Sequence, residues 1–139
     1  MRAPALILAA ALALSASQPV LAEGEAKVDN DQSVKISPVA LPIVADGHLA
    51  NYVFVTVKVL LNPGANAIAL NDKEPYFRDA LVRAAHRTPF VIKGDYNHVD
   101  EAKLRAALYP EAVRIAGPGA VRGIQVVSQQ AQHRVAAAR

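Results

Sequence analysis

Strict alternation over residues 51–62 constrains the fold more than any other feature of the sequence. Every second side chain is a branched aliphatic, namely Val53, Val55, Val57, Val59 and Leu61. Successive side chains of a β-strand point to opposite faces, so these five share one face, which we expect to be core. The opposite face is amphipathic and carries Tyr52, Phe54, Thr56, Lys58 and Leu60.

The segment 34–44 is apolar enough for a second strand but is interrupted by Pro38 and Pro42. Backbone N–H groups alternate sides along a strand, so prolines four apart remove donors on the same side. We therefore predict an edge strand with its prolines facing away from the sheet. The turn residues at 46–48 join it to 51–62, which predicts an antiparallel pair.

Two stretches show helical spacing. The first, 71–86, places Pro75 in the first turn, with Asn71 or Asp72 as the cap and Asp79 paired with Arg83 outside. Its expected buried residues are Phe77, Leu81, Ala84 and Ala85. After a short apolar link at 90–92, a second helix is expected from about residue 97 to residue 108. Pro110 should break or kink that helix, with 111–116 continuing as a short piece.

The segment 120–130 predicts a last strand, which should pair with 51–62 because the proline-bearing strand offers only one usable side. The fold class that follows is α+β: a three-stranded antiparallel sheet with two helices on one face, in the order β-β-α-α-β. With four tyrosines, three phenylalanines and no tryptophan, the core must depend on Val, Ile and Leu. No cysteine is present, which excludes disulfides, thiolate chemistry and cysteine-ligated metal centres.

Residues 1–22 have the pattern of a secretory signal peptide, with Arg2 followed by an apolar run and a cleavage site after Ala22. An uncleaved membrane anchor is the alternative, and only then is a membrane contact expected. Residues 23–33 predict a flexible acidic leader, 34–132 a single domain, and 133–139 a frayed basic tail. The expected location is the periplasm.

The sequence offers little support for catalysis. No serine lies in a nucleophile elbow, and no histidine pair has the spacing of a helical metal site. A zinc site assembled by the fold from His86, His98 and Asp95 stays open as an alternative, as does an enzyme that also uses Tyr96. We otherwise expect no catalytic residues, no metal and no cofactor. A net charge of only +3 is too weak a bias to argue for nucleic acid as a partner, and none is expected.

Two candidate surfaces remain. Arg78, Arg83 and Arg87 form a basic stripe along the first predicted helix, which could meet an acidic protein or an anionic polymer. The outer sheet face of Tyr52, Phe54 and Leu60 could hold an apolar molecule, although packing explains the same residues.

The run Glu-Pro-Tyr-Phe-Arg-Asp-Ala-Leu-Val at 74–82, with a hydrophobic strand before it and the segment 120–130 after it, resembles the periplasmic domain of the flagellar basal-body-associated FliL family. The resemblance covers about residues 35–132. It implies a non-enzymatic domain of stomatin-type fold that forms oligomers around a membrane complex and modulates the flagellar stator. Members of that family usually keep an N-terminal membrane helix, whereas this chain carries a segment that resembles a cleaved signal.

The sequence therefore predicts an exported, non-enzymatic interaction or scaffold domain. Its expected partner is a protein of the cell envelope, such as the flagellar stator, and self-association is a further expectation. The alternative is a periplasmic module that binds a small ligand.

Overall fold

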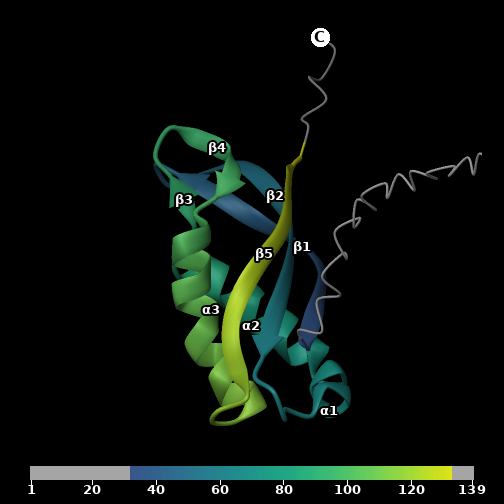
Figure 1. Ribbon diagram of the computed structural model, residues 1–139. Helices are drawn as coiled ribbons and strands as arrows, with labels where there is room; N and C mark the ends of the chain where they lie inside the picture. Colours follow the sequence, from purple (N-terminus) through teal and green to yellow (C-terminus); the bar gives the residue numbers. More distant parts are fainter. Residues whose placement is uncertain (1–31, 133–139) are drawn as a thin grey trace, which may run out of the picture.

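The computed structural model describes residues 32–132, which form a three-stranded antiparallel sheet, three helices and a two-stranded hairpin (Figure 1). The predicted signal peptide, most of the predicted leader and the predicted tail lie outside the described residues. The elements are β1 (Ser33–Ala45), β2 (His48–Leu61), α1 (Ala67–Asn71), α2 (Glu74–Arg87), β3 (Val91–Ile92), β4 (Asp95–Val99), α3 (Glu101–Ala116) and β5 (Val121–Ala131).

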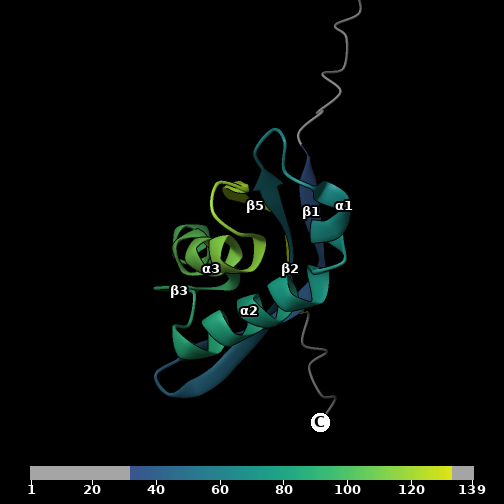
Figure 2. The same cartoon turned by 90° about the horizontal axis from the view of Figure 1, so that it is seen from below.

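The main sheet has the order β1-β2-β5, which confirms that 51–62 lies in the central strand. α2 packs against β1 and α3 against β5, and both helices lie on the same side of the sheet (Figure 2). The five aliphatic side chains of the β2 inner face are all buried, as the alternation predicts. The α+β class and the helices on one face are therefore confirmed.

A tight hairpin joins β1 to β2 where the turn was predicted. Ala45 pairs with His48, and the two residues between them, Asp46 and Gly47, have φ angles of 51° and 75°. Positive φ at both central positions is the signature of a type I′ turn, whose twist matches that of the strands.

β1 is an edge strand, as its prolines predict. Pro42 lies opposite Tyr52, and Pro38 lies at a bulge between Ile36 and Val39. The N–H of Ser37 at this bulge donates to Glu74 Oε1 over 2.8 Å, which fastens the start of α2 to the edge of the sheet. Proline and a bulge together leave few free donors along this edge.

The start of α2 differs from the prediction. The N-cap is Lys73, which makes no side-chain capping bond, so the expected cap at Asn71 or Asp72 is wrong. Asn71 instead ends α1, an element that the sequence did not reveal, and its side chain donates to Ala67 O over 2.8 Å. Pro75 does lie in the first turn of α2, and the four expected core residues of the helix are buried.

The second long helix begins later and continues further than predicted. Residues 95–99 form strand β4 rather than a first helical turn, and Asp100 caps α3 by accepting from Lys103 N over 3.1 Å. The predicted break at Pro110 is also wrong, because α3 continues to Ala116. Pro110 has no N–H, so the carbonyl of Ala106, one turn earlier, loses its usual hydrogen-bond donor. Both residues lie on the exposed side of α3, where water can donate to this carbonyl instead.

β5 does not alternate as evenly as its sequence suggests. Its register against β2 shifts twice, so that Val121 and Ile124 are both buried and Val127 is exposed. Each shift is a β-bulge, which inserts one residue and reverses the facing of those beyond it. Val121 and Ile124, three positions apart, therefore share the inner face.

Candidate interaction surfaces

The sheet face away from the helices carries the predicted ligand residues, but they do not form one patch. Tyr52 and Phe54 are 39% and 44% exposed and lie two positions apart on β2. Leu60 is only partly exposed and lies beyond Thr56 and Lys58, near the other end of the strand. The structure therefore places the two aromatic residues together and Leu60 apart from them.

The cross-strand neighbours extend the aromatic pair sideways. Pro42 of β1 lies opposite Tyr52, and Phe54 lies between Ala40 of β1 and Gln130 of β5. Side chains of directly opposed residues in antiparallel strands share a face and contact each other. We call the four residues Ala40, Pro42, Tyr52 and Phe54 the aromatic patch.

A basic row follows the aromatic patch on the same face. Lys58 lies between Lys35 of β1 and Gln125 of β5, so the two ammonium groups come from directly opposite positions. Opposed like charges destabilise a sheet slightly. This row would favour a partner with acidic groups beside its apolar ones.

The predicted basic stripe on α2 is largely paired. Arg83 binds Asp79 over 2.7 Å, the pair that the sequence predicted, and Arg87 lies 3.6 Å from Glu111 of α3. Glu111 is shared with Arg114, so this stripe helps to hold α2 against α3. Arg78 is exposed and takes part in none of these ion pairs. The stripe therefore offers less free positive charge than three arginines suggest.

The proposed zinc ligands do not come together. Asp95 and His98 of β4 form an ion pair of 2.8 Å between Oδ2 and Nδ1, whereas His86 lies on α2, and its Nδ1 donates to Val82 O over 2.8 Å. Over 32–132, no cluster of three or more residues able to hold a metal occurs. The hypothesis of a zinc site formed by His86, His98 and Asp95 is therefore wrong.

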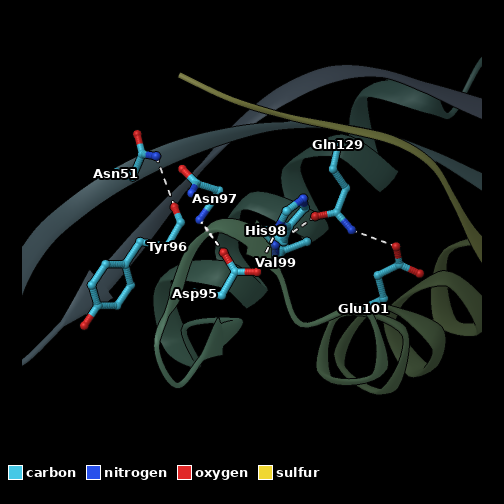
Figure 3. A network of polar contacts seen from close by, with 8 residues as sticks. All are labelled: Asn51, Asp95, Tyr96, Asn97, His98, Val99, Glu101 and Gln129. Carbon is cyan, nitrogen blue, oxygen red and sulfur yellow. Dashed lines mark hydrogen bonds and ion pairs between the residues drawn. The ribbon is translucent and has the colours of Figure 1, made fainter. Parts of the chain in front are cut away.

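A polar network connects the β3–β4 hairpin with the main sheet (Figure 3). Asn51 Nδ2 donates to Tyr96 O over 3.0 Å, and Gln129 Oε1 of β5 accepts from Val99 N over 2.8 Å. Gln129 Nε2 also donates to Glu101 Oε1 over 2.7 Å. Most of the predicted enzyme residues lie here, but their contacts hold the hairpin in place. The sequence did not indicate the role of Gln129, which lies 30 positions from Val99 along the chain.

The network predicts an acid-dependent contribution to stability. The Asn97 backbone N–H, and next the His98 imidazole, hold the pKa of the Asp95 carboxyl below its usual value. Because this pKa is lower in the folded state, the contribution is complete above the unfolded-state pKa and is lost as the pH falls through the folded one. A carbon-13 titration of the Asp95 carboxyl should show a midpoint below that of an unfolded peptide.

The His98→Ala variant separates the two causes. Its Asp95 midpoint should rise but stay below the peptide value, because the Asn97 N–H still donates over 2.8 Å. An unchanged midpoint would contradict the ion pair with His98.

A groove that the sequence did not predict lies between α3 and β5. It has a volume of about 430 Å³ and is lined by Arg105, Ala106, Tyr109, Arg122, Gly123 and Ile124. A smaller groove of about 210 Å³ lies between α2 and α3 and is lined by Ala84, Arg87, Thr88, Ala107 and Glu111. Neither groove includes the aromatic patch.

Together these elements define an α+β domain with one sheet face covered by helices and the other face open. Within residues 32–132, no helix is long and apolar enough to cross a membrane. No protein-family model matches the chain, and no curated protein matches it either.

Proposed function

We propose that this protein is an exported, non-enzymatic interaction domain that docks onto a protein of the cell envelope through its open sheet face. The aromatic patch is the observation that carries the proposal, because Tyr52 and Phe54 remain 39% and 44% exposed in a domain that buries its other phenylalanines. Aromatic residues are enriched where protein surfaces meet, and exposed apolar groups rimmed by polar ones favour such a contact.

A more specific version of the proposal follows from the resemblance to the FliL family. The β-β-α-α-β order of the main elements is compatible with that resemblance, and the 74–82 run begins α2. In this version the partner is the flagellar stator, and the protein associates with copies of itself. It acts in the periplasm after cleavage of the signal peptide behind Ala22. The flagellar role itself depends on the sequence likeness, with which the order of the elements is compatible.

The small-ligand alternative has less support. Leu60 is separated from Tyr52 and Phe54 by the Lys58 row, and the two grooves described above are lined by other residues. A small apolar ligand needs a concave site that removes most of its surface from water.

Photo-crosslinking in the native cell tests the docking face. A benzoyl-phenylalanine at position 54 should give a discrete adduct with an envelope protein. The same residue at Tyr76, which is 64% exposed on α2, serves as the matched control and should give none. Adducts of equal yield from both positions, or from neither, would contradict docking through the open face.

A deletion strain tests the flagellar form separately. Loss of swimming with filaments still present would support action at the motor. Normal swimming together with a specific adduct at position 54 would retain the envelope role and remove the flagellar one.

A further inference from the structure

The strongest unassigned feature is the basic row of the open sheet face, which is formed by Lys35 and Lys58. The two residues lie directly opposite each other in β1 and β2, so their side chains extend from the same face. Gln125 of β5 lies on the other side of Lys58 and continues the row without adding charge. Two positive charges are therefore concentrated at one place on the face that the helices leave open.

Both charges of the basic row are available to a partner. Lys35 is exposed, and Lys58 is partly exposed. Within residues 32–132 neither lysine takes part in an ion pair, whereas four of the five arginines of α2 and α3 bind carboxylates. The basic row is therefore unlike the arginine stripe of α2, whose charge is largely neutralised within the domain.

The open face has no acidic residue of its own to offset this charge. β1, β2 and β5 contain no aspartate and no glutamate. Glu74 of α2 reaches the β1 edge, but its Oε1 accepts from Ser37 N, and it forms no ion pair with either lysine. Like charges at opposed positions destabilise a sheet, so a partner that supplies carboxylates would relieve a repulsion that the domain leaves in place.

The aromatic patch lies at a fixed distance from the basic row. Phe54 is four residues from Lys58 along β2, which is about 13 Å at the usual rise of a strand. Thr56 of β2 and Ser128 of β5 pair in the row between them and are uncharged. A partner that packs an apolar side chain on Phe54 therefore meets the two lysines a short distance further along the same face.

We infer that the open face recognises an acidic protein surface, whose carboxylates contact the basic row while an apolar group packs on the aromatic patch. The rings supply the apolar contact, and the lysines select carboxylates and steer the approach of the partner. A protein is favoured over a nucleic acid because the main sheet contributes only two lysines, whereas binding of a phosphate backbone uses an extended basic groove. The inference rests on the proposed function, since it specifies the chemistry of the partner at the same face.

The first test uses the isotope-labelled full chain and a synthetic peptide in which a three-residue glycine–serine spacer joins two leucines to two glutamates. The spacer reproduces the separation of Phe54 from Lys58. Binding should shift the amide signals of Phe54, Lys35 and Lys58 together. A peptide with glutamines in place of the glutamates should bind about fivefold more weakly at low salt, the effect expected of two exposed ion pairs. In about 0.5 M salt the two peptides should bind equally, because the charges are screened.

Substitution of the basic row locates the contact. The Lys35→Gln/Lys58→Gln variant should bind the two peptides equally and should lower the yield of the native-cell adduct at position 54 about fivefold. The Arg78→Gln/Lys93→Gln variant removes the same charge from exposed positions outside the main sheet and should leave both results unchanged. Urea unfolding adds a second readout, since removal of two opposed like charges should leave the free energy of unfolding unchanged or slightly higher.

Four results would overturn the inference. They are equal binding of the two peptides at low salt, equal losses in the two double variants, a lower free energy of unfolding in the lysine variant, and tighter binding of a single-stranded oligothymidine than of the glutamate peptide. An undiminished adduct at position 54 in the lysine variant would remove the acidic partner and keep docking through the open face. Charge-selective peptide binding without any adduct at position 54 would do the reverse.

Discussion

Replacing Phe77 by alanine is expected to lower the free energy of unfolding by about 3–5 kcal/mol, the usual cost of removing a buried phenylalanine. Phe77 lies on the inner side of α2 and is fully buried in the core cluster. Small domains have a total stability of about 5–15 kcal/mol, so this single change should remove a large share of it. Urea unfolding followed by far-ultraviolet circular dichroism measures the difference.

The neighbouring residue provides the control. Tyr76→Ala removes a ring of similar size from the exposed side of the same helix and should change stability by less than about 1 kcal/mol. Phe77→Leu keeps part of the buried apolar surface and should fall between the two variants. Equal losses for the Tyr76 and Phe77 variants would contradict the placement of α2 on the sheet.

The second large effect is expected at Gln129. The Gln129→Ala variant leaves the N–H of the buried Val99 without its acceptor and removes a donor from Glu101. A buried unsatisfied donor costs about 1–3 kcal/mol, which should appear as a lower free energy of unfolding. The β3–β4 hairpin should also loosen, and faster hydrogen exchange at the Val99 amide measures this directly.

Gln130→Ala is the matched control for this variant. Gln130 is the next residue of β5, but it is exposed on the open sheet face beside Phe54. Its replacement should change stability by no more than about 0.5 kcal/mol and should leave the Val99 amide unaffected. Faster hydrogen exchange at the Val99 amide in both variants would show that the hairpin is not held by the Gln129 side chain specifically.

Local patterns account for most of the main architecture. Alternation over 51–62 predicts both a strand and its buried face, and Pro38 and Pro42 predict an edge, because a proline cannot donate to a neighbouring strand. These features act within a few residues, so they can be recognised without knowledge of the partner elements. The central place of β2 then follows, because the proline-bearing strand can pair on one side only.

The incorrect predictions concern segments whose structure depends on distant contacts. The second helix was predicted to begin near Asn97, but Asn97 lies in strand β4, where Gln129, 30 positions away from Val99, binds the extended backbone. Pro110 was expected to break or kink the second helix, yet α3 continues through it to Ala116 as one helix, because the carbonyl that loses its donor lies on the side open to solvent. Local propensity decides such segments only when no tertiary contact outweighs it.

The candidate surfaces show the same division. The sequence predicted that Tyr52 and Phe54 share an outer face, because side chains two positions apart in a strand point to the same face of the sheet. It did not predict the groove between α3 and β5, because its lining residues Arg105 and Arg122 lie on separate elements that come together only when α3 packs beside β5.

By itself, therefore, the sequence determined the central strand, the edge strand, the turn between them and the buried face of α2. The tertiary structure alone decided where α3 begins, how the bulges reorient β5, and which charged residues line a common groove. The physical reason is range: steric and hydrogen-bonding preferences act over a few residues, whereas bulges, caps and grooves depend on groups that only the folded chain brings together.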